Sequence, residues 1–146
     1  MRIWFDMDGT IADLYAVDGW LADLRAESIR PYAEAKVLHN MAVLARFLNR
    51  VQENGHEIGI ISWTAKYSTK GYAEAVAEAK KVWLRKHLPS VRWDEIKIVA
   101  YGVNKLEATG GGILFDDEEP NRDTWGEGAY KPEEILEVLK NLAKRG

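Results

Sequence analysis

The chain has 146 residues, 47% hydrophobic and 29% charged, which is typical of one soluble domain with a substantial core. The absence of cysteine excludes disulfides, thiolate zinc sites and a cysteine nucleophile, and the net charge of −3 argues against a general affinity for nucleic acid or anionic membranes. The first residues lack the pattern of a signal peptide, and no apolar run reaches the roughly 18 residues of a membrane-spanning helix. We therefore expect a cytoplasmic protein.

The first half of the chain alternates short apolar runs with amphipathic stretches. Residues 2–5 predict a short buried strand. Apolar residues recur at helical spacing in 17–27 and again in 36–53, and Gly55 is placed to end the second of these helices. Residues 56–62 predict the next strand.

The second half continues this alternation. It predicts a helix at 72–87, strands at 96–100 and 112–115, a short fifth strand at 129–130, and a final helix that begins near Pro132. Strands alternating with helices predict an α/β fold with a mostly parallel central sheet flanked by helices, in one domain spanning residues 1–146. In such sheets the active site lies outside the carboxyl ends of the strands.

The string FDMDGT, residues 5–10, follows the first strand. Asp6 and Asp8 are two positions apart, so they leave an extended strand on the same side, and Gly9 allows a sharp turn that brings backbone amides near an anion. An aspartate can take up a phosphoryl group as an aspartyl-phosphate, and a second acid can protonate the leaving oxygen. The alternative is a surface turn, but the preceding strand and the full DxDGT string argue against it.

Two adjacent acids, Asp116 and Asp117, follow the strand at 112–115. Carboxylates at a buried strand end repel each other unless a cation or a proton joins them. Together with Asp6 they offer the hard oxygen ligands that Mg²⁺ prefers. The alternative is a solvated acidic turn, because the run DDEEPN is rich in charge.

Ser62 ends the second long strand, where its hydroxyl can donate to a phosphoryl oxygen, and Thr64 is its nearest competitor. Lys105 can neutralise the nucleophile and hold phosphate. Taken alone, strand capping explains Ser62 equally well, and a solvent-exposed loop explains Lys105 better.

In this order, strand–DxDGT, strand–Ser, Lys and strand–DD resemble the four motifs of the haloacid dehalogenase-like hydrolases, over nearly the whole chain. The resemblance implies a Rossmann-like fold with a minimal helical cap at about residues 12–33. It also implies that Asp6 is the nucleophile, that Asp8 is the general acid/base, and that Ser62 and Lys105 bind and neutralise the phosphoryl group. By the same resemblance, Mg²⁺ has four ligands: Asp6, Asp8 through its backbone carbonyl, Asp116 and Asp117.

Asp8 favours a phosphatase, since dehalogenases of the family lack this aspartate and transport ATPases carry threonine there. The implied reaction is Mg²⁺-dependent hydrolysis of a phosphomonoester through an aspartyl-phosphate. A closer likeness, carried by KKVWLRKHLP, IKIVAYGVNK and ILFDDEEPN, is to the 5′(3′)-deoxyribonucleotidase branch and to similar phage-type hydrolases, which makes a 5′- or 3′-nucleotide the first candidate substrate. The stretch between Asp6 and Ser62 is, however, short for the helical cap of that branch.

Aromatic and basic side chains bear on the substrate. Three residues are expected to contact it: Thr10, Trp63 and Thr64. Three further aromatic residues are candidates for stacking on a base: Tyr15, Trp20 and Tyr67. For Trp20, packing between cap and core is the favoured role. Four basic residues are expected to form a solvated helix face: Lys80, Lys81, Arg85 and Lys86.

Two other functions remain open. The small cap suits removal of 3′-phosphates from nucleic-acid ends, although the acidic net charge opposes a nucleic-acid partner. The other is a non-catalytic phosphate-binding or partner-binding module on the same fold. The presence of both Asp6 and Asp8 argues against such a module, because binding alone does not need an acid/base. The sequence does not indicate the oligomeric state.

Overall fold

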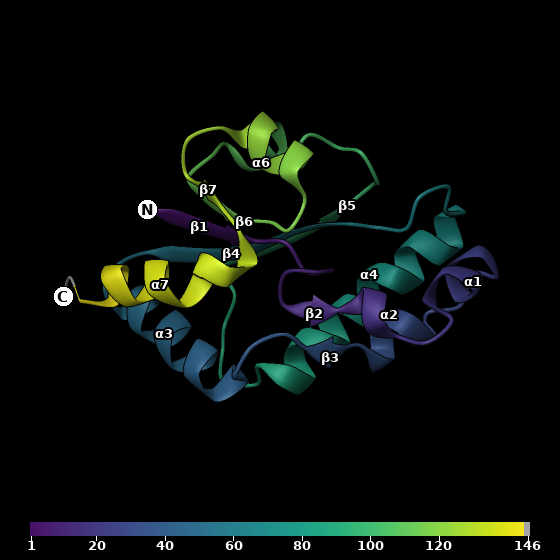
Figure 1. The fold of residues 1–146 in the computed structure, drawn as a ribbon, viewed down its shortest axis with the longest axis horizontal. Helices are drawn as coiled ribbons and strands as arrows, with labels where there is room; N and C mark the ends of the chain where they lie inside the picture. Colours follow the sequence, from purple (N-terminus) through teal and green to yellow (C-terminus); the bar gives the residue numbers. More distant parts are fainter. Residues whose placement is uncertain (145–146) are drawn as a thin grey trace.

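Five parallel strands form the central sheet of the computed structural model, which describes residues 1–144 (Figure 1). In spatial order they are β5 (Glu95–Val99), β4 (Glu57–Trp63), β1 (Arg2–Phe5), β6 (Ile113–Phe115) and β7 (Ala129–Tyr130). β1 is central, and its last residue, Phe5, pairs in register with Ile60 of β4 and Phe115 of β6. The carboxyl ends of β1 and β6 therefore lie side by side, with the end of β4 close to them.

Successive side chains of β1 point to opposite faces of the sheet, and both faces are buried. Ile3 and Phe5 belong to the larger core. Three helices cover that face: α3 (Met41–Glu53), α4 (Lys70–His87) and α7 (Ile135–Ala143), the last preceded by the 3-10 turn η2 (Pro132–Glu134). Trp4 points to the other face, which two short helices cover: α5 (Lys105–Thr109) and α6 (Glu119–Trp125). Figure 1 shows α6 on one side of the sheet and α3 and α7 on the other.

Residues 12–37 form an insertion between β1 and α3. It consists of β2 (Ala12–Asp13), the 3-10 turn η1 (Leu14–Ala16), α1 (Trp20–Arg25), α2 (Arg30–Glu34) and β3 (Lys36–Val37). β2 and β3 pair in antiparallel fashion and close the base of the insertion. Leu14 and Tyr32 pack against Tyr72 and Val76 of α4, and the Tyr72 hydroxyl donates to the carbonyl of Ser28 at 2.7 Å. The insertion is thus fixed to α4.

The predicted helix at 36–53 begins later than expected. Lys36 and Val37 belong to β3, and the helix starts at Met41, because the side chain of Asn40 caps it by accepting a hydrogen bond from the amide of Val43 at 3.2 Å. The pattern of apolar residues could not mark this boundary, since the pairing of β3 with β2 is a contact between distant segments. The short helices α2, α5 and α6 were not predicted either.

The predicted α/β class is confirmed, with a parallel sheet, helices on both of its faces and a fifth strand at Ala129–Tyr130. Large apolar side chains such as Phe5 are fully buried in it, and each such burial contributes about 1.5–3 kcal/mol to folding. In the described part of the chain, every helix is too short or too polar to cross a membrane.

Candidate active site

Asp6 stands at the centre of the carboxyl edge of the sheet. Its amide continues the pairing of β1 with β6 by donating to the carbonyl of Phe115 at 3.0 Å. Its side chain is 9% exposed, so the carboxylate is available at the edge while most of it is shielded from water. The strand order therefore places this acid beside the residues that follow β6.

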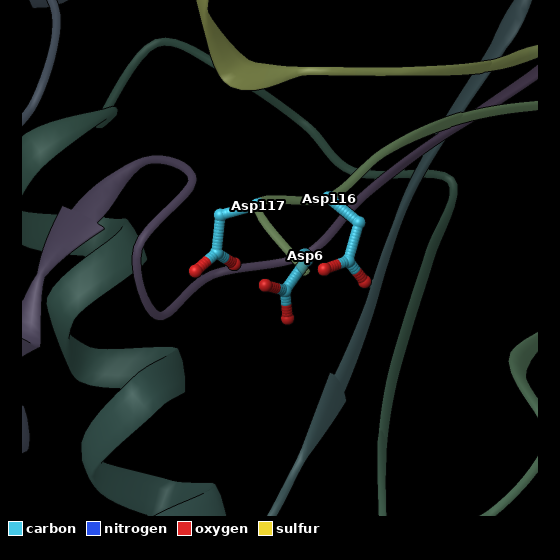
Figure 2. A group of neighbouring side chains, drawn as sticks. All are labelled: Asp6, Asp116 and Asp117. Carbon is cyan, nitrogen blue, oxygen red and sulfur yellow. The ribbon is translucent and has the colours of Figure 1, made fainter. Parts of the chain in front are cut away.

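Asp116 and Asp117 lie beside Asp6, and one oxygen of each of the three carboxylates lies within 4.8 Å of the others (Figure 2). Burial and the nearby charge of Asp6 raise the pKa of Asp116 to about 6 and the pKa of Asp117 to about 8. Converging carboxylates repel one another, as the raised pKa values of Asp116 and Asp117 reflect, and a hard divalent cation relieves that repulsion. The residues present therefore fit Mg²⁺, which takes oxygen ligands.

The turn after Asp8 is shaped by Gly9 and Thr10. Gly9 has φ +80°, and a Cβ there would lie 2.3 Å from Oδ2 of Asp117, so only glycine fits. The fully buried Thr10 hydroxyl accepts from the amide of Asp117 at 3.2 Å. It lies 3.2 Å from Asp6 Oδ2 and 3.3 Å from Asp117 Oδ1, to either of which it can donate. Thr10 thus contacts the carboxylates and does not line the cavity described below.

Lys105, the first residue of α5, is buried among the same acids. Its Nζ donates to Asp6 Oδ1 at 3.0 Å and to Asp116 Oδ2 at 2.7 Å. Burial alone lowers the pKa of Lys105, but the two carboxylates outweigh it and raise the pKa above its usual value. The lysine is therefore charged and sits beside the candidate nucleophile. Asn121 of α6, which sequence reasoning missed, donates to Asp116 Oδ2 at 3.2 Å.

Lys80 was expected on a solvated helix face, and this expectation is wrong. Lys80 is only 1% exposed. Its ammonium donates three hydrogen bonds, to Asp8 Oδ2 at 2.8 Å, to Ser62 Oγ at 2.7 Å and to the Trp63 carbonyl at 2.7 Å. Three donors thus meet three acceptors. A sequence signal existed, because Lys80 lies four residues after Val76 on the buried stripe of α4.

The pKa of Asp8 is subject to opposing effects. Burial raises its pKa, the charge of Lys80 lowers it, and the net result is a pKa above the usual range of an aspartate. A raised pKa lets a carboxyl keep a proton for a leaving group, whereas the ion pair with Lys80 fixes where the carboxyl points.

Ser62 and Thr64 differ in their surroundings. Ser62 is fully buried and its hydroxyl oxygen accepts from Lys80, whereas Thr64 lines the cavity. Because the Ser62 oxygen already accepts from the ammonium, its own proton must be directed elsewhere. Thr64 is therefore placed to donate to a phosphoryl oxygen in the cavity, and Ser62 is placed to hold Lys80.

A cavity of about 240 Å³ opens above these groups. Its charged lining includes Asp6, Asp8 and Lys105. Its walls are largely aromatic, with five rings: Tyr15, Trp20 and Tyr32 from the insertion, Trp63 after β4 and Tyr101 after β5. Tyr101 is a further residue that sequence reasoning missed.

The aromatic walls are held by ring contacts and hydrogen bonds. Trp20 packs edge-to-face on Tyr15 with 5.1 Å between centroids and lines the cavity, so its packing role and its place at the site coincide. Trp63 lies 4.9 Å from the Tyr101 ring, donates from Nε1 to the Val103 carbonyl at 2.9 Å and has Lys105 Nζ 5.0 Å from its ring. Tyr67 is 91% exposed and lies outside the lining.

No family model and no curated protein matches the sequence. Among solved structures, the chain is similar to a D,D-heptose 1,7-bisphosphate phosphatase from B. bronchiseptica, complexed with magnesium and phosphate, with 12% identity, 99% of each chain covered and a TM-score of 0.56. It is also similar to the D,D-heptose 1,7-bisphosphate phosphatase from Burkholderia thailandensis, with 13% identity, 96% of each chain covered and a TM-score of 0.51. This chain has the fold of these phosphatases. At such low identity the similarity establishes the fold, an α/β fold with a mostly parallel sheet as expected from the sequence, and leaves substrate and mechanism to the residues of the site.

Proposed function

We propose that this protein is a Mg²⁺-dependent phosphomonoester hydrolase of the haloacid dehalogenase-like superfamily. The observation that carries the proposal is a pair of acids, Asp6 and Asp8, at one cavity, each held by its own buried lysine. Asp8 lines the cavity with its carboxyl tied to Lys80, and Asp6 is tied to Lys105. The structural neighbours, one of which was solved with magnesium and phosphate, support the same reaction class.

The metal would be held by carboxylates and one carbonyl. Asp6, Asp116 and Asp117 supply the converging oxygens, and the resemblance adds the backbone carbonyl of Asp8. Mg²⁺ bound there supplies positive charge that offsets the phosphate approaching several carboxylates. Lys105 adds a fixed positive charge on the other side of Asp6.

The first half-reaction transfers the phosphoryl group to Asp6. A carboxylate oxygen of Asp6 attacks phosphorus, and the bond from phosphorus to the leaving oxygen breaks. Asp8 gives its proton to that oxygen, so an alcohol leaves instead of an alkoxide. Lys105 and Thr64, which line the cavity, bind the phosphoryl oxygens, and Ser62 holds the ammonium of Lys80, which in turn holds Asp8.

The second half-reaction releases phosphate. Asp8, now a carboxylate, accepts a proton from water, and the water oxygen attacks phosphorus. The bond between phosphorus and Asp6 breaks, which regenerates the Asp6 carboxylate and leaves Asp8 protonated. Both steps need Asp8 to point into the cavity, and the ammonium of Lys80 fixes that direction.

The aromatic walls support a substrate whose leaving group carries a flat aromatic ring. Tyr15 and Trp20 on one side, with Trp63 and Tyr101 on the other, offer ring faces and edges on which a base can stack. A 5′- or 3′-nucleotide is therefore the proposed substrate class. The minimal cap, residues 12–37, favours as second candidate the removal of a 3′-phosphate from a nucleic-acid end, because a small insertion leaves room for a longer leaving group.

Phosphate release from a panel of phosphomonoesters tests the proposal. The panel contains 5′- and 3′-mononucleotides, sugar phosphates and a 3′-phosphorylated oligonucleotide, each assayed with Mg²⁺, with EDTA and with the Asp6→Asn variant. We expect release that needs both Mg²⁺ and Asp6. If the folded wild-type protein releases phosphate from none of them, the non-catalytic binding module becomes the better account.

A further inference from the structure

We propose that Lys66 forms a subsite at the mouth of the cavity for a second phosphate group, carried by the leaving group of the substrate. This inference rests on the proposed phosphatase activity and extends it to a substrate class, namely phosphomonoesters that bear a further phosphate. Lys66 lies in the loop between β4 and α4, is exposed, and belongs to the lining of the cavity.

The ammonium of Lys66 lies over two aromatic rings. Its Nζ is 5.1 Å from the centroid of the Tyr67 ring and 5.7 Å from the centroid of the Tyr101 ring. Tyr101 lines the cavity as well and pairs with Trp63. Lys66 is thus part of the aromatic wall that reaches from the reacting groups to solvent.

Within the described part of the chain, the ammonium of Lys66 is free of carboxylates and open to a ligand, unlike those of Lys80 and Lys105. Lys80 and Lys105 are buried and each donates to at least one carboxylate at 2.7–3.0 Å. Across residues 1–144, Lys66 forms no salt bridge with a carboxylate, and its contacts are the two rings. A cation–π contact at an exposed position is weak, whereas a phosphate offers the ammonium both an opposite formal charge and hydrogen-bond acceptors. A phosphate oxygen is therefore a better partner for Lys66 than those it has.

The charge of the cavity favours a role for this lysine with a doubly phosphorylated substrate. The other charged residues of the lining are three acids and one cation: Asp6, Asp8, Glu118 and Lys105. Lys105 is engaged with Asp6 and Asp116. A leaving group with its own negative charge meets repulsion at the mouth unless a positive group faces it, and Lys66 is the exposed cation there.

The loop that carries Lys66 is held in place on both sides. Before it, the amide of Thr64 donates to the carbonyl of Val99 at 2.8 Å. After it, the Ser68 hydroxyl donates to the carbonyl of Ala65, and Thr69 donates from its amide and hydroxyl to the carboxylate of Glu27 in the insertion. These contacts fix the backbone around the lysine, so less ordering is left for the moment of binding.

Tyr67 supports the same interpretation. It has φ +58°, a left-handed conformation that is unfavourable for a residue with a side chain. Despite this cost its ring is 91% exposed, so burial of the ring does not explain the conformation. What the conformation does achieve is to hold the ring beside the ammonium of Lys66 at the mouth.

The second phosphate can come from two sources with the same chemistry. One is a free phosphate on the same small molecule, as in a nucleoside 3′,5′-bisphosphate or a sugar bisphosphate. The other is the phosphate that joins two nucleotides, next to a terminal phosphate. Both present oxyanions to a lysine, which binds them as a point charge without demanding one geometry.

The experiment compares substrates in pairs that differ only in the second phosphate. 5′-AMP is paired with adenosine 3′,5′-bisphosphate and glucose 6-phosphate with glucose 1,6-bisphosphate. In the internucleotide arm, 3′-AMP is paired with a dinucleotide that carries the same 3′-terminal phosphate and adds the internucleotide phosphate with one nucleoside. Each is assayed with Mg²⁺ on the wild type and on Lys66→Met, Lys66→Arg and Lys70→Met. Lys70 is a matched control because it is an exposed lysine four residues away, on α4 and outside the cavity lining.

We expect kcat/KM to be at least about tenfold higher for the doubly phosphorylated member of a pair, through a lower KM, as one charged hydrogen bond allows. Lys66→Met should remove that preference, whereas Lys66→Arg and Lys70→Met should keep it. A gain for the dinucleotide assigns the internucleotide phosphate, and a gain for the bisphosphates alone assigns a free phosphate.

Three results overturn the inference: equal kcat/KM within each pair, a preference that survives Lys66→Met, or an equal loss of preference in Lys70→Met. If the monophosphates are hydrolysed while one of these results is found, the proposed function stands and the subsite does not. If phosphate is released from neither member of any pair, the proposed function fails, and the subsite fails with it.

Discussion

Lys80 Nζ lies 2.8 Å from Asp8 Oδ2, in a contact that joins the middle of α4 to the turn after β1. The same ammonium holds Ser62 and the carbonyl of Trp63 at the end of β4. One buried side chain thereby ties together the proposed acid/base and the proposed phosphoryl-binding strand end. A carboxyl that must deliver a proton to one oxygen benefits from such a fixed direction.

Replacing Lys80 should therefore damage catalysis more than folding. Lys80→Met keeps most of the volume but leaves Asp8 and the Trp63 carbonyl without their donor, so we expect kcat to fall by about 100-fold or more and the free energy of unfolding to fall by about 1–3 kcal/mol. Lys86→Met, at an exposed position on the same helix, is the control. Steady-state kinetics and urea unfolding measure both effects. A kcat within about threefold of the wild type would remove Lys80 from this role.

Substituting alanine for Gly9 should weaken Mg²⁺ binding, whereas the same substitution at Gly71 should not. Gly9→Ala places a Cβ 2.3 Å from Asp117 Oδ2 at φ +80°, so the carboxylate or the turn must shift, and we expect Mg²⁺ affinity to fall by at least about tenfold. Gly71 has no atom within 4 Å of its Cβ position and no left-handed φ, so Gly71→Ala should bind Mg²⁺ as the wild type does. Isothermal titration with Mg²⁺ compares the two. Equal affinities in the two variants would contradict the metal position.

Stability of the metal-free protein should fall as pH rises. The pKa values of Asp116, about 6, and Asp117, about 8, are raised by burial and by Asp6, so the folded state binds these protons more tightly than the unfolded state. The contribution of each protonated carboxyl is full below the ordinary pKa of 3.8 and is lost as pH rises from there, up to about 6 for Asp116 and about 8 for Asp117. Mg²⁺ replaces the protons, so the rise in Tm on adding Mg²⁺ should be larger at pH 8.5 than at pH 6. An increase in Tm that is the same at both pH values would argue against these carboxylates as the metal ligands.

Ser62 and Thr64 should give different kinetic phenotypes. Thr64 lines the cavity, so Thr64→Ala should raise KM, whereas Ser62 holds Lys80 and Ser62→Ala should lower kcat, each by about tenfold. Initial rates over a range of substrate concentrations separate the two parameters. The opposite pattern would exchange the proposed roles of the two hydroxyls.

The local pattern of apolar residues was sufficient to predict much of the fold and the residues at the centre of the site. β1, β4, α4 and β6 carry strong apolar periodicity, and Asp6, Asp116 and Asp117 follow strands directly, so the rule about strand ends predicted that they meet. The prediction of Lys105 as a site residue was weaker from sequence alone, because a lysine at the start of a five-residue helix leaves little periodic signal.

Contacts between distant segments account for what the sequence did not predict. The pairing of β2 with β3 places Lys36 and Val37 in a strand, so α3 begins only at Met41. This pairing joins residues more than twenty positions apart, which a local pattern does not reveal. Lys80 was assigned to the surface because charged residues are rarely buried, and only its three acceptors, which come from β4 and the turn after β1, make that burial favourable. Tyr101 lines the cavity from a loop that carries no motif.

The most direct test of the central claim is to trap the phosphoryl group on Asp6. Asp8→Asn can still accept a phosphoryl group from p-nitrophenyl phosphate, whose leaving group needs no proton, but it lacks the base that activates water for the second step. We predict that this variant, mixed with the substrate and Mg²⁺ and quenched in acid, gains the mass of one phosphoryl group on the peptide that contains Asp6, and that Asp6→Asn/Asp8→Asn does not. Turnover by Asp8→Asn without any phosphorylated peptide, or a phosphoryl group on another residue, would contradict Asp6 as the nucleophile.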